Sequence, residues 1–98
     1  MTEQHFQKKV LDYIKSIGGY ARKINNANMT GVPDVFACIE GFFFAFECKV
    51  EESEGTQLQQ YNIRLIETAG GSAAVVWKLD QVKWIIQNKL NSIKNKGV

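Results

Sequence analysis

Apolar side chains recur along the first part of the chain at the spacing of an amphipathic helix. Between Thr2 and Ile17 they lie three or four residues apart, at Phe6, Val10, Tyr13, Ile14 and Ile17. Thr2 can cap the start of this helix, and Gly18-Gly19 can end it. The pattern therefore predicts a first helix that turns one face toward a core.

Two later segments show the same helical spacing. In residues 56–69, one face of the expected helix carries Leu58, Tyr61, Leu65 and Ala69. Gly70-Gly71 can end this helix. Asp80 can cap a last helix, whose apolar face is expected to bury Val82, Ile85, Ile86, Leu90 and Ile93.

Four shorter apolar runs have the length and composition of β-strands. They cover residues 20–24, 34–39, 42–50 and 72–77, and they are rich in aromatic and β-branched residues. Glu40-Gly41 separates the second run from the third and predicts a tight hairpin turn. The expected order is α-β-β-β-α-β-α, which favours an α/β fold with a mixed central sheet flanked by helices.

Length and charge restrict the possible roles of the chain. A chain of 98 residues supports one compact domain, covering residues 1–98. Its net charge of +2 is too small to indicate a nucleic-acid partner by itself, although acidic residues gather between Glu40 and Glu54 with basic residues before and after them. The longest unbroken apolar run, residues 42–46, is too short to span a membrane, so we expect no membrane association.

The two cysteines show no sign of a zinc site. Cys38 and Cys48 lie in strand-like runs and lack the CxxC spacing of zinc ligands. We expect both to be reduced and buried, in a cytoplasmic protein.

Charged residues at the end of the third strand are the main candidates for chemistry. Because side chains alternate along a strand, Glu47 and Lys49 point to the same side of the sheet. With a turn at Glu40-Gly41, antiparallel pairing places Asp34 opposite Glu47 within about one residue. Two carboxylates this close repel unless a cation lies between them, and Mg²⁺ prefers such oxygen ligands. Glu-x-Lys alone favours an exposed salt bridge of at most about 1 kcal/mol.

Three short motifs follow one another on these elements: Gly31-Val32-Pro33-Asp34, Glu47-Cys48-Lys49 and Thr56-x-x-Gln59. Their order and spacing resemble those of the PD-(D/E)xK nuclease superfamily, with its restriction-endonuclease-like core of order α-β-β-β-α-β. More narrowly, the chain resembles the virus-type replication-repair nuclease (VRR-NUC) domain in its stand-alone phage and bacterial form. The resemblance extends from the first helix to Trp77.

This resemblance implies a Mg²⁺- or Mn²⁺-dependent endonuclease of a bacterial cell or phage-infected host, with a role in DNA repair. The implied metal ligands are Asp34, Glu47, the backbone carbonyl of Cys48 and Glu3, and Lys49 is the implied catalytic amine. Glu3 is equally explained as an acidic residue favoured by the helix dipole. Gln59 is the further implied catalytic residue, with Gln60 as the alternative if the register differs by one; Thr56-x-x-Gln59 is also a capping box.

The resemblance also implies partners and a substrate. Stand-alone relatives are homodimers similar to Holliday-junction resolvases, so we expect a homodimer that cuts branched DNA and needs no small-molecule cofactor. A two-fold substrate that needs two cuts suits a dimer with two active sites. Two alternatives remain at this stage: a nicking or restriction-type nuclease acting on ordinary duplex DNA, and a non-catalytic DNA-binding module of the same fold.

Overall fold

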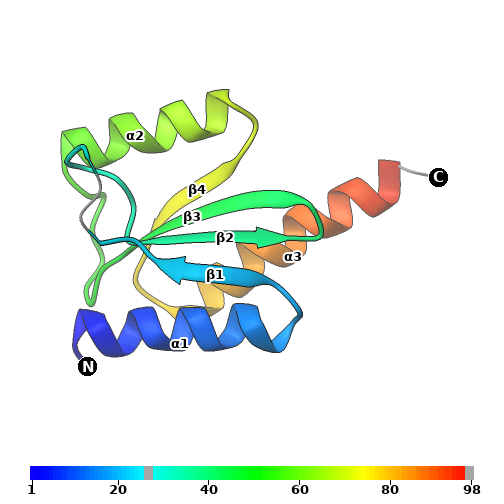
Figure 1. Cartoon of the computed structure of the whole chain (residues 1–98), viewed down its shortest axis with the longest axis horizontal. Helices are drawn as coiled ribbons and strands as arrows, with labels where there is room; N and C mark the ends of the chain where they lie inside the picture. Colours follow the sequence, from blue (N-terminus) through cyan, green and yellow to red (C-terminus); the bar gives the residue numbers. More distant parts are fainter. Residues whose placement is uncertain (26–27, 97–98) are drawn as a thin grey trace.

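The computed structural model describes residues 1–25 and 28–96 as an α/β fold with three helices and four strands. In chain order the elements are α1 (Glu3–Ser16), β1 (Tyr20–Lys23), β2 (Val35–Ile39), β3 (Phe42–Cys48), α2 (Gln57–Thr68), β4 (Ser72–Val76) and α3 (Leu79–Lys96) (Figure 1). The predicted order α-β-β-β-α-β-α is confirmed. Within the described residues, no helix is long and apolar enough to span a membrane.

The four strands form one mixed sheet in the order β1-β2-β3-β4. β2 pairs antiparallel with both β1 and β3, whereas β4 runs parallel to β3. Ile39 pairs with Phe42, so Glu40 and Gly41 alone make the hairpin turn. Both turn residues have positive φ, 51° and 86°, as a type I′ turn requires. This turn fixes the register of the β2–β3 hairpin.

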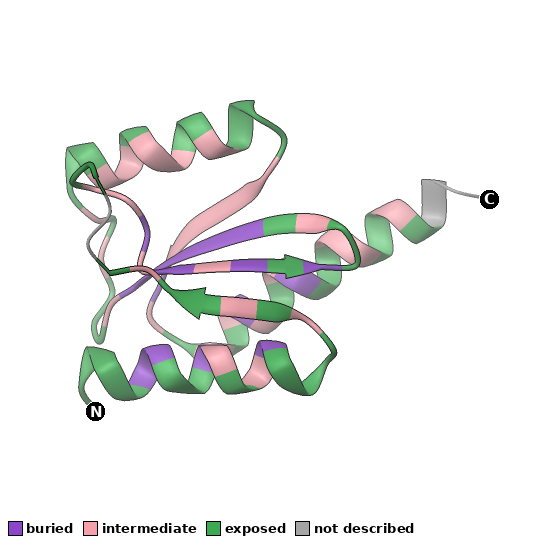
Figure 2. Ribbon diagram, in the orientation of Figure 1, coloured by how far each residue is buried: buried purple, intermediate pink, exposed green. Residues whose placement is uncertain are grey.

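The main core lies between one face of the sheet and helices α1 and α3. α1 contributes Phe6, Val10 and Ile14 to it, and α3 contributes Val82 and Ile86. The facing strand residues, at alternate positions, are Val35, Ala37, Ile39, Phe44, Phe46, Cys48 and Val76. Figure 2 shows this buried layer along β2, β3 and one side of α1.

α2 covers the opposite face of the sheet only in part. It packs against β4 and β3, and none of its residues is fully buried (Figure 2). Leu58, Tyr61 and Leu65 are 44–49% exposed, so the apolar face expected to be a core face is turned to solvent. The partly buried residues of α2 are Gln59, Gln60, Asn62, Ile63 and Ile66. The sequence pattern identified the helix but not the side that faces the sheet.

Two further expectations are wrong. Asp80 does not cap α3, because the helix already begins at Leu79; the oxygen of Gln81 instead accepts hydrogen bonds from the N–H groups of Trp77 (2.7 Å) and Lys78 (3.0 Å). Cys38 is exposed, whereas Cys48 is buried, and both are free thiols. Cys38 points to the face that α2 leaves open, beside the exposed Tyr20 with which it pairs.

Candidate active site

Asp34 and Glu47 meet at the end of the sheet where β2 begins and β3 finishes. Val35 pairs with Phe46, so Asp34, one residue before Val35, lies opposite Glu47. The carboxylate oxygen Oδ2 of Asp34 accepts a hydrogen bond from the Cys48 N–H at 2.9 Å. The backbone carbonyl of Asp34 accepts another from the Ile24 N–H at 2.7 Å. The first bond holds Asp34 against the strand that carries Glu47, and the second ties it to the residue that follows β1.

Glu47 is a buried carboxyl in an unfavourable electrostatic environment. It is only 4% exposed, and its pKa rises from 4.5 to about 7. The main cause is desolvation, followed by the charge of Asp34 and by hydrogen bonding between the two carboxyl groups. Lys49 acts in the opposite direction, with its Nζ 3.6 Å from Glu47 Oε2. Two carboxyls with one amine leave an excess of negative charge at this site.

Lys49 follows directly after β3 and remains accessible. Its N–H donates to the carbonyl of Val76 at 2.9 Å, which fixes the backbone at this point. Its side chain is 25% exposed. An amine in this position can contact both Glu47 and a phosphate group approaching from solvent.

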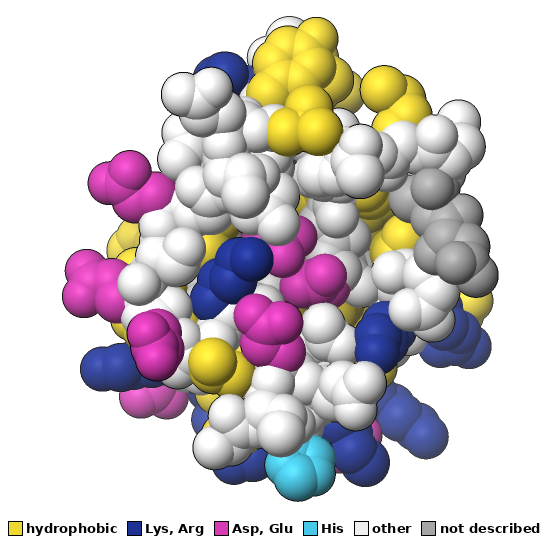
Figure 3. Space-filling model, turned by 90° about the vertical axis from the view of Figure 1, so that its left-hand side faces the viewer, with side chains coloured by type: hydrophobic (Ala, Val, Ile, Leu, Met, Phe, Trp, Pro, Cys, Tyr) yellow, Lys and Arg dark blue, Asp and Glu magenta, His cyan; other side chains and the backbone are white. Residues whose placement is uncertain are grey.

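Glu3 lies beside this group but remains exposed. It borders a hollow of about 330 Å³ together with Lys49, Val50, Glu51, Glu52 and Ser53. Figure 3 shows this end of the molecule, where acidic side chains gather around a basic one. Glu3 therefore shares an open hollow with Lys49.

Cys48 is a buried thiol beneath these acidic groups. Burial, and then the charges of Asp34, Glu47 and Glu3, raises the pKa of its thiol to about 12. The sulfur therefore stays protonated and is no ligand for a hard cation. Any contribution of this residue to a metal site rests on its backbone carbonyl, as the family resemblance implies.

Gln59 lies at the start of α2, on the side of the sheet that carries Glu47. Its side-chain oxygen accepts from the Thr56 N–H (2.9 Å), and Thr56 Oγ1 accepts from the Gln59 N–H (3.1 Å). This is the predicted capping box. Gly55 lies against both Gln59 and Val75, and Val75 pairs with Glu47. Gln60 donates instead to the carbonyl of Glu54 at 3.1 Å.

One polar residue was missed by the sequence analysis. Gln7 on α1 is 7% exposed, and its side-chain oxygen has no hydrogen-bond partner among the described residues. Residues 3, 7, 10 and 14 lie at the same helical spacing as the apolar stripe, so position 7 could have been identified as buried. A pattern of apolar residues alone does not mark a polar side chain at this position as buried.

The donor atoms at this end of the sheet suit a hydrated hard cation better than a closed cage of side chains. In the part of the chain that the structure describes, no group of three or more His, Cys, Asp or Glu side chains could hold a metal ion. Asp34 and Glu47 supply two carboxylates, and Mg²⁺ commonly binds through one or two carboxylates while keeping several waters. The pair therefore fits Mg²⁺ chemistry.

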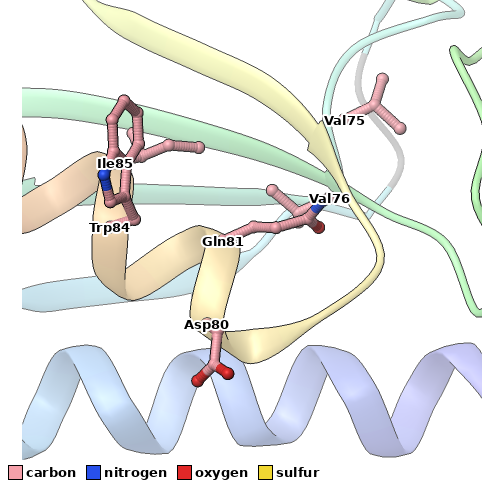
Figure 4. A pocket seen from close by; sticks show the side chains of 6 residues that line it. All are labelled: Val75, Val76, Asp80, Gln81, Trp84 and Ile85. Carbon is pink, nitrogen blue, oxygen red and sulfur yellow. The ribbon is translucent and has the colours of Figure 1, made fainter.

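A separate hollow of about 370 Å³ lies between β4 and the first turns of α3 (Figure 4). Its lining residues are Val75, Val76, Asp80, Gln81, Trp84 and Ile85. The oxygen of Gln81 is already used by two backbone N–H groups, and Asp80 points away from the other side chains (Figure 4). This hollow lacks the converging charged groups that chemistry on DNA requires.

The chain and its fold have counterparts among known proteins. Residues 8–97 match the family model described as archaeal Holliday junction resolvase (Hjc). A solved structure titled as a VRR_NUC domain is 24% identical, with a TM-score of 0.75 over 87% of this chain and 94% of the other. Hjc from Archaeoglobus fulgidus, titled as a Holliday junction resolvase, is 17% identical, with a TM-score of 0.56 over 72% of this chain and 63% of the other. No curated protein sequence matches the chain.

Proposed function

Because the chain belongs to the archaeal Holliday junction resolvase family, we propose that it is a divalent-metal-dependent endonuclease that hydrolyses phosphodiester bonds in branched DNA. The observation that carries this proposal is the buried Glu47 beside Asp34, with Lys49 3.6 Å from the Glu47 carboxylate. Such a group of two acids and an amine has little structural purpose without a cation and an anionic substrate.

Each residue has a defined role in this proposal. Asp34 and Glu47 hold the cation, together with the carbonyl of Cys48. A bound Mg²⁺ or Mn²⁺ supplies Lewis acidity toward the scissile phosphate and lowers the pKa of an attacking water. Lys49 stabilises negative charge on the phosphate. Glu3 and Gln59 border the site and orient substrate or water.

DNA contacts come from basic residues around this end of the molecule. Arg22 and Lys23 on β1 are exposed, as is Lys78 between β4 and α3. The chain in its described part shows no zinc site or separate reading domain, so contacts with phosphates and with the shape of the branch determine binding. The polar loop 25–31, which follows Arg22 and Lys23, is a further source of phosphate contacts; its residues 26 and 27 lie outside the described residues.

The proposal is tested by cleavage of labelled four-way junction, flap and linear duplex in Mg²⁺, in Mn²⁺ and in EDTA. We expect junction cutting that requires metal and is lost in Glu47→Gln and Lys49→Ala. Glu67→Gln, at an exposed site on α2, is the matched control and should cut normally. Equal cutting of linear duplex would favour a nicking or restriction-type nuclease. DNA binding in EDTA without cutting in any metal would favour a non-catalytic module.

We further propose that two copies assemble through α2. Leu58, Tyr61 and Leu65 form a stripe on the outer side of this helix, each 44–49% exposed. Figure 3 shows hydrophobic side chains gathered over α2 at the top of that view. Phe43, 39% exposed, continues the apolar surface across a hollow of about 350 Å³ beside Ala69.

A second copy is the occupant that this surface fits best. A two-fold axis across α2 places the stripe of one copy against the same stripe of the other, as an isologous interface requires. A stable dimer covers about 800 Å² of each partner, about one eighth of the 6446 Å² surface of this chain. Two active sites related by a two-fold axis also match the symmetry of a four-way junction.

Light scattering during gel filtration tests this assembly. We expect the wild-type protein at twice the mass of one chain, and Leu65→Glu at the mass of a single folded chain. Trp84→Glu, at a 66% exposed site on α3, is the control and should remain a dimer. A monomeric wild-type protein, or a dimeric Leu65→Glu, would refute the proposed interface.

A further inference from the structure

The unpartnered side chain of Gln7 points to an additional member of the cation site. Gln7 is only 7% exposed. Its side-chain oxygen Oε1 accepts no hydrogen bond from the residues that the structure describes. Leaving a buried amide oxygen without a donor costs free energy, and native proteins usually satisfy such atoms with a bound water or an ion. Gln7 is therefore an acceptor whose donor is not a protein atom of the described chain.

The position of Gln7 on α1 places it toward the acidic end of the sheet. Gln7 lies one helical turn after Glu3 on the same face, and Glu3 borders the hollow with Lys49. Glu3, Asp34 and Glu47 are all close enough to Cys48 for their charges to act on its thiol. α1 packs against β3, and its first turns lie beside the loop that follows β3 (Figure 1).

Burial decides which of the two α1 residues faces inward. Glu3 is exposed at the rim, whereas Gln7 lies between the helix and the sheet with its neighbour Val10, which is fully buried. A neutral amide is also the acceptor that the site tolerates best here, because a third carboxylate would add to the repulsion between Asp34 and Glu47.

We propose that Gln7 is a positioning residue whose side-chain oxygen accepts a hydrogen bond from water bound to the divalent cation of Asp34 and Glu47. This inference rests on the proposed metal-dependent function. Mg²⁺ in such sites keeps several waters, and residues that bind those waters fix the orientation of the hydrated ion. Loss of such an outer partner commonly lowers metal affinity 10–100-fold.

The test compares Gln7→Met with wild type in two measurements that do not need activity. Met has nearly the same shape as Gln but lacks the acceptor. Mn²⁺ affinity is measured by titration calorimetry and by the signal of free Mn²⁺ in electron paramagnetic resonance. Thermal unfolding in EDTA reports on the metal-free fold. Gln4→Met, at an exposed position on the same helix, is the matched control.

We expect Gln7→Met to weaken Mn²⁺ binding about tenfold or more while its melting temperature in EDTA stays equal to or above that of wild type. Unchanged Mn²⁺ affinity would overturn the inference, as would a large loss of stability in EDTA with affinity intact. If Gln7→Met does not fold, Gln7→Leu replaces it with the same expectation of weaker Mn²⁺ binding, and unchanged affinity would overturn the inference.

Failure of the inference and failure of the proposed function give different results. If wild type binds Mn²⁺ and Glu47→Gln does not, the cation site stands whatever Gln7→Met shows. If wild type itself binds no Mn²⁺, the metal-dependent function and the role of Gln7 both fail.

Discussion

Glu47 makes the stability of the metal-free protein depend on pH in a specific direction. Folding raises the pKa of this carboxyl from 4.5 to about 7, so the folded protein binds the proton more tightly than the unfolded chain. The stabilising effect of that proton is fully present below about pH 4.5 and is lost as the pH rises through 7. Since one pKa unit corresponds to about 1.4 kcal/mol, the charged Glu47 destabilises the fold by about 3 kcal/mol above pH 7.

Glu47→Gln removes this charge and keeps the shape of the side chain. In urea unfolding with EDTA, we expect the variant to match wild type near pH 4 and to exceed its free energy of unfolding by about 3 kcal/mol at pH 8. The difference at pH 8 corresponds to more than about 10 °C in melting temperature for a domain of this size. Adding Mg²⁺ at pH 8 should stabilise wild type and leave Glu47→Gln unchanged, because a cation offsets the repulsion with Asp34. Glu67→Gln controls for loss of one exposed carboxylate. Parallel pH curves for wild type and Glu47→Gln would refute the reasoning.

Two further predictions test the packing around the site. Cys38 is exposed and should react at once with a thiol reagent such as DTNB in the native protein. Cys48 should react only after unfolding, because it is fully buried and burial raises the pKa of its thiol to about 12. Two thiols that react at the same rate would contradict the structure. Gly31→Ala should cost about 2 kcal/mol or more in chemical unfolding, since Gly31 has φ +82° and an added Cβ would lie 2.6 Å from Leu58 Cγ. Gly41→Ala, at φ +86° with open space around it, isolates the backbone cost at about 1 kcal/mol; equal losses in the two variants would show that the contact with Leu58 is unimportant.

The element order and the alignment of the two carboxylates could be predicted from the sequence because both depend on local patterns. A two-residue turn at Glu40-Gly41 leaves one antiparallel register, and that register brings Asp34 to Glu47. The spacing of apolar residues likewise located all three helices.

The side of α2 that faces the sheet could not be predicted in the same way. A helical stripe shows that an apolar face needs a partner, but it does not show whether the partner is the sheet or another molecule. Leu58 and Leu65 therefore looked like core residues, although the structure leaves both nearly half exposed. The burial of Gln7 could not be predicted for a related reason. A polar residue next to an apolar stripe on a helix is expected to mark the solvent-facing edge of that stripe, whereas Gln7 is buried.

Because the Cys48 N–H donates a hydrogen bond to Asp34 Oδ2, the Asp34 carboxylate has a structural role as well as the proposed metal-binding role. One oxygen closes the end of the β2–β3 hairpin, and the other remains available to a cation. The orientation of Asp34 is thus set during folding. A cation bound at the proposed site would meet a carboxylate that has already lost its rotational freedom, which lowers the entropic cost of binding. This double role limits substitution at position 34. A replacement would have to accept the hydrogen bond from the Cys48 N–H and also carry a negative charge for the proposed cation. Among natural side chains of this length, only aspartate does both.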